Sequence, residues 1–424
     1  MSGDADDGIK YGELIVLGYN GMHTLCSDKN HRTVSRFTLY RQHAGNGVTK
    51  GQVHVVKAPK HSQAVLDNSK HSISFTLNKN KAVVVEYDDD PNTDMFQIGR
   101  SSEPQINFTV VDTWLGVAKD ASEVHQSKLQ STISRYACRI LIDRNEPYTP
   151  RLYAAGFDSS RNVYLGEKAT KWTTATGEID GLTTNGVLIL HPSQETDSSS
   201  SYVWREVSVG GDIYSLRETR SASQRGRLIE GETDILTDGT LVDLCGATLL
   251  WRSAEGLAQT PTRKQLESRL DELNAGRPQC PVNLNTLVIP RGRVPKISPS
   301  NPSHQMPQWI PYVYFGCGHV QGKHDWGHIE EGARHVCPLC ARESDVIVQL
   351  SMGMESTFHL DSDQPTYAFK PCGHMASERT VKYWSRIPLP QGSSSFCPVC
   401  PFCTVPLDTS QPHVRIILQD NCSS

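Results

Sequence analysis

The C-terminal part of the sequence carries two copies of one pattern of metal-ligand residues. Both copies read Cys-Gly-His followed by Cys-Pro-x-Cys, and their eight ligands are Cys317, His319, Cys337, Cys340, Cys372, His374, Cys400 and Cys403. Each Cys-x-His or Cys-x-x-Cys pair can bind a metal ion from a single tight turn, and two pairs complete a tetrahedral shell around zinc. The pattern therefore predicts two structural Zn²⁺ ions, in closed sites that leave no position for water chemistry.

The last of these pairs has two possible registers. Cys397-Pro-Val-Cys400 and Cys400-Pro-Phe-Cys403 overlap, and each would place two sulfur atoms on one turn. The spacing alone does not choose between Cys397 and Cys403.

The sequence contains no P-loop, no Gly-x-Ser-x-Gly and no His-Glu-x-x-His motif, so we assign no catalytic residue.

A second set of residues, in the first part of the chain, is suited to binding phosphate. Arg100 follows a short predicted strand, Ser134 and Arg135 precede another, and Thr184 and Asn185 precede a third. Binding residues of a β-sandwich usually lie at such loop–strand junctions. A guanidinium fork, hydroxyl groups and an amide are donors that suit phosphate oxygens. Each residue alone is more often part of a turn or of the solvated surface, but their order on a β background favours one shared site.

Many short strands are predicted between about residue 10 and residue 252. Apolar runs separated by turn residues occur at 73–77, 83–85, 106–110, 138–142, 187–190 and 247–251. Short runs with this spacing are typical of an all-β sandwich.

One helix and one linker are predicted after the β region. Thr262 is a suitable N-cap, Gln265 completes a capping box, and Gly276 lies where a C-terminal cap belongs. We expect the leucines of this helix to close the β region. Eight prolines between residues 277 and 311 disfavour both helix and sheet, which predicts a linker. The predicted domains are therefore 10–276, 277–311 and 312–424.

The overall composition restricts the possible partners. The chain has 424 residues, a formal net charge of −4 and no basic stripe, which disfavours binding to nucleic acid. No apolar run approaches the length of a membrane span, and the acidic N-terminus does not resemble a signal peptide. The cysteines outside the repeated pattern lack disulfide-like spacing. We therefore expect a cytoplasmic protein that binds neither nucleic acid nor membrane.

The order of the phosphate-suited residues resembles that of the forkhead-associated (FHA) domain, a β-sandwich that binds phosphothreonine through loops at one end. Gly99-Arg100, Ser134 and Thr184-Asn185-Gly186 match its motif positions. The sequence departs from the family at Ala137, where a histidine is often found. The β region is also longer than a minimal FHA domain. The resemblance thus implies a mainly β fold, with an FHA-type sandwich and an added β appendage.

The whole arrangement resembles the Pellino family, which combines an FHA-like region, a proline-rich linker and a doubled zinc-ligand module. The stretches 153–160, 180–186, 215–220, 243–251 and 383–390 are similar to sequences of that family. The resemblance implies that a small zinc-binding RING-like α+β module follows the sandwich, and that the protein is a RING-type E3 ubiquitin ligase of Toll and innate immune signalling. It also implies three partners, namely a phosphorylated receptor-associated kinase of the Pelle/IRAK type, a ubiquitin-loaded E2 enzyme and ubiquitin.

Two points about the zinc sites depend on this resemblance. It favours Cys400 with Cys403 as the final pair, and it implies a cross-brace in which alternate pairs share an ion. Sequential pairing, with each half holding its own ion, fits the sequence equally well.

The competing function is a non-catalytic, phospho-dependent adaptor of the same pathway.

Overall fold

The computed structural model describes residues 8–19, 35–57, 69–112, 131–192, 202–292, 308–323, 335–391 and 395–419. These residues form two compact units, the first built mainly from Val34–Ala254 and the second mainly from Glu255–Leu389 and Phe396–Ser424. The predicted fold class is confirmed: the first unit is a β-sandwich with an appendage, and the second is a small α+β module that carries the Cys/His clusters.

Two sheets of the first unit enclose its core. The larger sheet has the order β15 (Ile213–Ser215), β14 (Arg205–Val207), β13 (Val187–Leu190), β16 (Leu241–Asp243), β17 (Ala247–Ser253), β1 (Lys10–Tyr19) and β2 (Arg36–Tyr40). The smaller sheet has the order β7 (Phe108–Thr109), β6 (Thr93–Gly99), β8 (Cys138–Asp143) and β9 (Pro150–Ala154). Buried side chains of both sheets, such as Ile189 and Ile140, belong to one apolar cluster. Burial of this apolar area is the main force that holds the sheets together.

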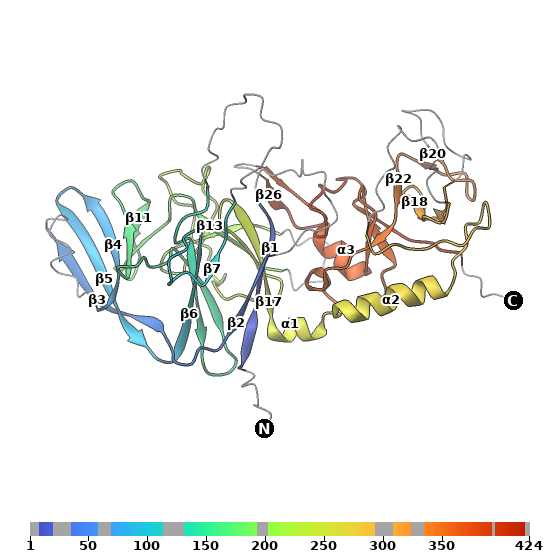
Figure 1. The fold of residues 1–424 in the computed structure, drawn as a ribbon. Helices are drawn as coiled ribbons and strands as arrows, with labels where there is room; N and C mark the ends of the chain where they lie inside the picture. Colours follow the sequence, from blue (N-terminus) through green and yellow to red (C-terminus); the bar gives the residue numbers. More distant parts are fainter. Residues whose placement is uncertain are drawn as a thin grey trace, which may run out of the picture. The chain divides into compact units, whose positions relative to one another are not determined.

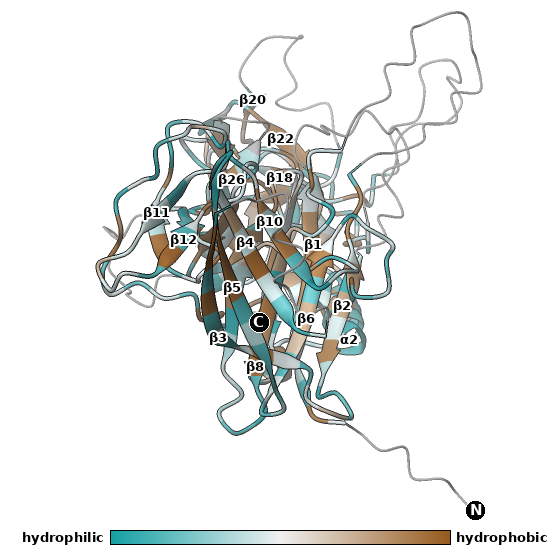
Figure 2. Ribbon diagram, turned by 90° about the vertical axis from the view of Figure 1, so that its left-hand side faces the viewer, coloured by the Kyte–Doolittle hydropathy of each residue, from teal (hydrophilic) through white to brown (hydrophobic). Residues whose placement is uncertain are grey.

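The appendage is assembled from two separate insertions into the sandwich. One insertion supplies β3 (Gly47–Val56), β4 (His71–Asn78) and β5 (Lys81–Asp90), and the other supplies β10 (Asn162–Leu165) with the hairpin of β11 (Lys171–Thr173) and β12 (Ile179–Gly181). Strand β10 pairs in parallel with β4, which closes a four-stranded sheet of order β10-β4-β5-β3. This sheet lies to the left of β6 and β13 in Figure 1. Its strands carry both apolar and polar segments in Figure 2, and Ile73, Phe75 and Val85 of this sheet belong to the apolar core cluster.

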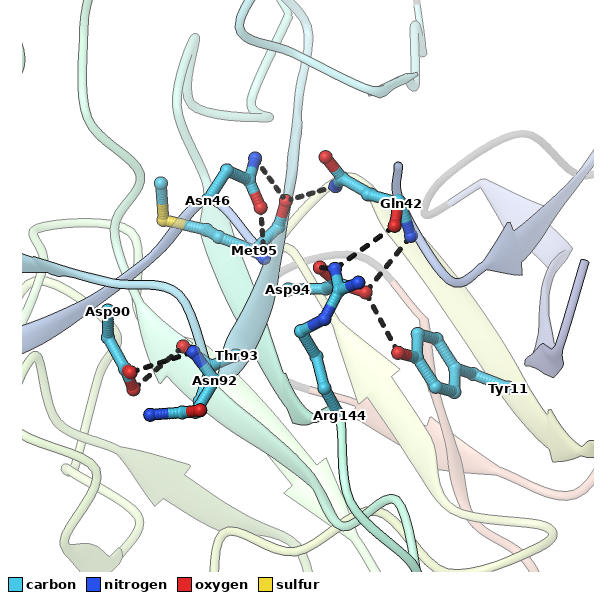
Figure 3. A network of polar contacts seen from close by, with 9 residues as sticks. All are labelled: Tyr11, Gln42, Asn46, Asp90, Asn92, Thr93, Asp94, Met95 and Arg144. Atoms are coloured by element: carbon cyan, nitrogen blue, oxygen red, sulfur yellow. Dashed lines mark hydrogen bonds and ion pairs between the residues drawn. The ribbon is translucent and has the colours of Figure 1, made fainter. Parts of the chain in front are cut away.

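A polar network fixes the start of β6. The buried Asp94 carboxylate accepts hydrogen bonds from the Tyr11 hydroxyl at 2.8 Å, from the Gln42 backbone N–H at 3.0 Å and from the Arg144 guanidinium at 2.6 Å (Figure 3). Burial and the Asp94 carboxylate raise the pKa of Tyr11, so the hydroxyl stays protonated and continues to donate. The network ties both sheets together at the end of β6 opposite Arg100, which follows its last residue.

Five of the six predicted apolar runs form strands over most of their length: β4, β5, β8, β13 and β17. The run at 106–110 forms only the two-residue strand β7. On either side of β7, the N–H groups of Asn107 and Val110 still donate to the Gln97 and Gly99 carbonyls of β6, whereas the N–H of Ile106 donates to the nearby Glu103 carbonyl. The alternation of this run therefore reflects burial at the margin of the sheet rather than a long strand.

The predicted helix is confirmed, and the structure places it in the second unit. Helix α1 (Ala254–Gln259) is followed by α2 (Arg263–Ala275), which has Thr262 as N-cap, the capping box with Gln265, and Gly276 as C-cap. Leu266 and Leu270 pack with Val313 and Phe315 in the core of the second unit. We expected these leucines to close the β region, but the apolar surface that they cover belongs to the C-terminal module.

The first half of the predicted linker also packs against this module. Cys280, Leu287 and Ile289 are buried in the same core as α2. Prolines 278, 281 and 290 thus lie in an irregular segment that buries apolar side chains. Residues 293–307 of the predicted linker lie outside the described residues.

Short strands dominate the second unit. One sheet has the order β19 (Val320–Gln321), β18 (Tyr312–Tyr314) and β22 (Ile347–Gln349), and another has the order β23 (Ser351–Met352), β25 (His374–Ala376), β24 (Tyr367–Phe369) and β28 (His413–Arg415). The other elements that follow residue 311 are the pairs β20 (His335–Val336) with β21 (Glu343–Ser344) and β26 (Leu389–Gln391) with β27 (Ser395–Cys397), the 3₁₀ helix η2 (Ser356–Phe358) and helix α3 (Glu378–Trp384). Among the described residues of the whole chain, no helix has the length and apolar character needed to cross a membrane.

Candidate functional site

The structure brings together the three loops that were predicted to bind phosphate. Arg100 lies directly after β6, and its backbone N–H donates to the Ser134 carbonyl at 3.1 Å. The next residue, Ser101, donates from its N–H to the Arg135 carbonyl at 3.2 Å. Gly99 permits this approach, since a Cβ atom there would lie 2.0 Å from the Arg135 carbonyl oxygen. The first two loops are thus joined through their backbones.

Asn185 joins the third loop to the second. Its side-chain Nδ2 donates to the Thr132 carbonyl at 2.7 Å and lies 3.4 Å from the Ser134 hydroxyl. Gly186 follows with a φ of +70°, a conformation that favours glycine. The Asn-Gly pair therefore turns the chain into β13 while its amide holds the neighbouring loop.

The predicted donors differ in how much of their side chain is already engaged. The Arg100 Nε–H donates to the Ile133 carbonyl at 2.8 Å, and this bond orients the guanidinium group. Thr184 is exposed and Ser134 is half-buried. The exposed Arg135 guanidinium lies over the ring of Tyr136, at 5.6 Å from the ring centroid. The arrangement offers a guanidinium group, hydroxyls and an amide at one end of the sandwich, which is the chemistry that a phosphate dianion requires.

One residue of these loops was not predicted from the sequence. The Thr132 N–H and hydroxyl both donate to the Asp112 carboxylate at 3.0 Å, and the hydroxyl also approaches the Cys245 carbonyl at 3.2 Å. Thr132 thus fixes the carbonyl that accepts from Asn185. No signal in the sequence relates Thr132 to Asp112 or Cys245, because these contacts come from the packing of remote loops.

The eight predicted metal ligands form two clusters in the second unit. One cluster contains Cys317, His319, Cys337 and Cys340, and the other contains Cys372, His374, Cys400 and Cys403. Within each cluster the four ligand atoms lie within 4.8 Å of one another. Three thiols and one imidazole at this separation can hold a metal ion, and the set is a common structural shell for zinc.

Both clusters are built from the same two turns. The Cys-Gly-His turns connect β18 to β19 and β24 to β25, and their glycines, Gly318 and Gly373, have φ values of +83° and +75°. In the Cys-Pro-x-Cys turns, the N–H of Ala341 donates to the Cys337 carbonyl at 2.9 Å, and that of Thr404 donates to the Cys400 carbonyl at 2.7 Å. The sequence repeat is therefore also a structural repeat.

The clusters bear on two alternatives that the sequence left open. Each cluster unites consecutive pairs, an arrangement that contradicts the expected cross-brace and matches sequential pairing. The reason is that each Cys-Pro-x-Cys turn folds back onto the Cys-Gly-His turn of its own half. Cys403 belongs to the second cluster, and Cys397, in β27, does not.

Three of the six cluster thiols are held in the protonated form. Burial raises the pKa of the Cys317 thiol to about 12 and raises the pKa values of Cys372 and Cys400 well above their usual range, whereas hydrogen bonds from the Cys372 and Cys400 thiols lower the pKa of Cys403. A metal ion that binds these sulfurs must therefore displace protons, and its charge would compensate for the buried thiolates.

The two halves interlock through crossed strands. Strand β22, from the first half, runs on into β23, which pairs in parallel with β25 of the second half, with Ser351 opposite His374. The chain after β28, from the second half, reaches back in the same way, and Ile417 pairs in parallel with His319. Ser351, which follows β22 of the first half, therefore lies beside His374 of the second half. Ile417, which follows β28 of the second half, lies beside His319 of the first half. We call Ser351–Met352 and Ile417 the crossed strands.

Comparison with known proteins identifies the family of this chain. Family models described as "Pellino, FHA domain" and "Pellino, RING domain" match residues 2–269 and 273–423. Protein pellino of Drosophila melanogaster is 53% identical over 99% of this chain and 97% of its own length. The human E3 ubiquitin-protein ligase pellino homolog 2 is 51% identical, over 97% of this chain and 95% of its own length. The chain belongs to the Pellino family.

Membership in the Pellino E3 ubiquitin ligase family gives the two units their names. The sandwich with its converging loops is the Pellino FHA domain, and the interlocked module is the Pellino RING domain. The mouse pellino homolog 3, 50% identical over 98% of this chain and 91% of its own length, is also named an E3 ubiquitin-protein ligase. The predictions of family, fold class and enzyme class are therefore confirmed.

Proposed function

We propose that this Pellino protein binds a phosphothreonine-containing protein through its FHA domain and a ubiquitin-loaded E2 enzyme through its RING domain, so that ubiquitin passes to the bound protein. The single observation that carries the first half is the convergence of Arg100, Ser134 and Asn185 on one end of the sandwich. The phosphoprotein that we propose is a receptor-associated kinase of the Pelle/IRAK type, in a cytoplasmic Toll pathway.

In this proposal Arg100, Ser134, Thr184 and Asn185 donate to the phosphate, and the exposed Arg135 adds positive charge beside it. Because the Nε of Arg100 is already bonded to Ile133, the terminal nitrogens of its guanidinium are the atoms that can reach the ligand. A charge-assisted hydrogen bond is about twice as strong as a neutral one. The guanidinium should therefore contribute the largest share of the phosphate affinity.

We further propose that each cluster of the RING domain binds one Zn²⁺ with structural effect. The donor set supports this proposal, since three sulfurs and one imidazole nitrogen within 4.8 Å suit a tetrahedral site. Zinc bound there would hold the turns of both halves in place. The RING domain is then a rigid platform for the E2, and no residue of this chain forms a covalent bond to ubiquitin. Its contribution is the effective concentration of two reactants held together.

A reconstituted reaction with purified E1, a panel of E2 enzymes, ubiquitin and the phosphorylated kinase tests this function. We expect ubiquitin chains on the kinase, and we expect Arg100→Ala to abolish them without changing E2-dependent formation of free chains. Cys340→Ser should abolish both reactions. Arg205→Ala, which breaks an ion pair with Glu232 elsewhere in the FHA domain, serves as the matched control and should alter neither.

The competing function, a non-catalytic adaptor, predicts a different result. An adaptor would bind the phosphorylated kinase through Arg100 but would form no ubiquitin chains with any E2 of the panel. Binding of the kinase that does not depend on its phosphorylation would contradict the first half of the proposal.

A further inference from the structure

We propose that Arg217 and Arg220 are positioning residues of the phosphate site, which hold the Thr183–Gly186 loop from behind by its backbone carbonyls. The inference rests on the phosphothreonine function proposed above and adds residues to that site. We call the two side chains with their carboxylate partners the arginine clamp.

The first half of the clamp is a fully buried ion pair. The Arg217 guanidinium bonds to both oxygens of the Glu206 carboxylate, at 2.6 and 3.0 Å, and the two side chains are each 2% exposed. The same Nη2 atom donates to the Thr183 carbonyl at 2.9 Å. The Nη1 atom donates to the Ala222 carbonyl at 3.1 Å. A buried charge with this many fixed partners has little freedom to move.

The second half of the clamp acts two residues further along the same loop. The Arg220 Nη1 atom lies 3.4 Å from the Asn185 carbonyl, and the Nη2 atom donates to the buried Asp243 carboxylate. Asp243 also accepts from the Thr248 hydroxyl at 2.9 Å and from the Cys245 N–H at 3.0 Å. Its position is therefore fixed independently of Arg220.

The strand register explains why the clamp fits over this loop. Leu188 of β13 pairs with Glu206 of β14 on one side and with Asp243 of β16 on the other. The two carboxylates thus flank β13 at one level, directly after the Asn185–Gly186 turn. In the Ser215–Arg220 segment, Arg217 forms an ion pair with Glu206, and Arg220, three positions later, forms one with Asp243. Space for the first pair also depends on Gly186, where a Cβ atom would lie 2.6 Å from the Glu206 carboxylate.

The consequence for the site follows from Asn185. Its carbonyl meets Arg220, and its side chain holds Thr132 and Ser134 of the second loop. If Arg220 is removed, the turn can rotate, and the Asn185 amide and the Thr184 hydroxyl lose their fixed positions. Affinity for phosphate depends on such preorganisation, because hydrogen-bond donors that are fixed before binding need not be ordered when the ligand arrives. Arg220 therefore acts through Asn185 and does not itself need to touch the ligand.

The test compares Arg220→Ala with the control Arg205→Ala in the full chain. We expect Arg220→Ala to weaken binding of a phosphothreonine peptide about tenfold, the effect of losing one hydrogen bond, and Arg205→Ala to leave it unchanged. The double variant Asn185→Ala/Arg220→Ala should bind the peptide no more weakly than Asn185→Ala alone, since both changes remove the same positioning. Additive losses in the double variant would overturn an action through Asn185.

Hydrogen exchange of the loop provides a readout that does not need a ligand. The Gly186 N–H donates to the Thr183 carbonyl at 3.2 Å, and we expect Arg220→Ala to speed its exchange about tenfold while Arg205→Ala does not. If the wild-type chain binds no phosphopeptide, the proposed function fails, yet exchange still decides whether the clamp orders the loop. Unchanged exchange in Arg220→Ala would overturn the clamp.

Discussion

Asn185 and Thr132 are 53 residues apart in the chain, yet the Asn185 amide donates to the Thr132 carbonyl at 2.7 Å. This bond joins the loop of Asn185 to the loop of Ser134. Backbone hydrogen bonds from Arg100 and Ser101 join the remaining phosphate-suited loop to the loop of Ser134. The candidate phosphate site is therefore a small set of cross-links between loops, and removing different links should have different effects.

The first prediction concerns the direct contact that we propose between the Arg100 side chain and phosphate. Arg100→Ala should weaken binding of a phosphothreonine peptide by roughly tenfold to a hundredfold, corresponding to about 1.5–3 kcal/mol for a charged hydrogen bond. Arg100→Lys should restore only part of this affinity, because an ammonium group cannot reproduce both the Nε bond to Ile133 and a fork toward phosphate. Isothermal titration with the phosphorylated and unphosphorylated peptide measures both. Equal affinity of wild type and Arg100→Ala would remove Arg100 from the site.

The second prediction concerns the number of zinc ions and the choice of cysteine. The full chain should hold two zinc ions, and Cys397→Ser should retain both of them and the E2-dependent activity, because Cys397 lies outside the second cluster. Cys403→Ser should hold fewer than two and lose the activity. Metal analysis by mass spectrometry of the purified variants gives the count. If both variants keep two ions, the three thiols exchange within one site; the reverse pattern would assign Cys397 instead.

The third prediction tests the interlocking of the two halves. A Cβ atom at Gly373 would lie 2.1 Å from the Gln349 carbonyl oxygen, directly before the crossed strand Ser351–Met352. Gly373→Ala adds this collision to the strain of a positive φ, roughly 1–2 kcal/mol. We expect the variant to lose zinc from both clusters at a lower chelator concentration than wild type, since each half supports the other.

Gly177→Ala is the matched control for this prediction. Gly177 has a φ of +85°, but no heavy atom lies within 4 Å of the position that a Cβ atom would take there, so the substitution adds strain without a collision. Its zinc retention should equal that of wild type. Loss of zinc from only one cluster in Gly373→Ala would argue against mutual support.

The fourth prediction concerns the pH dependence of the FHA domain. Burial lowers the pKa of His71, and the nearby Arg161 guanidinium lowers it further. The unfolded chain then binds the proton more readily than the folded one. The stability contributed by neutral His71 is present above a pH of about 6.5 and is lost as the pH falls through 6.5 toward the folded pKa.

His71→Gln should therefore reduce the loss of stability between pH 7.5 and pH 5.5. Urea unfolding is monitored through the hydrogen exchange of the β13 and β17 amides, and this measurement reports on the FHA domain alone. The exposed His43→Gln serves as the control and should keep the wild-type dependence. A pH dependence in His71→Gln as steep as that of wild type would exclude this histidine as the cause.

Local chemistry determined much of what could be predicted. The helix at Arg263–Ala275 begins and ends where Thr262, Gln265 and Gly276 indicate, because its capping groups lie within the helix termini themselves. The eight ligands of the two metal clusters were also recognisable, since each pair needs only a short turn to bring its two atoms together. The candidate residues of the three phosphate-suited loops were chosen from their order along the chain and its resemblance to a known family, and the structure brings these loops together.

The tertiary structure decided which of these local units meet. Spacing allowed both the cross-brace and the sequential pairing, and only the folding of each half brought consecutive pairs together. The leucines of α2 fitted either domain by pattern alone, and the apolar surface of the RING domain is the one that buries them. Thr132, Arg217 and Arg220 acquire their roles from partners on remote strands and loops. Side-chain contacts across such separations depend on strand register and packing, which a local pattern of residues does not specify.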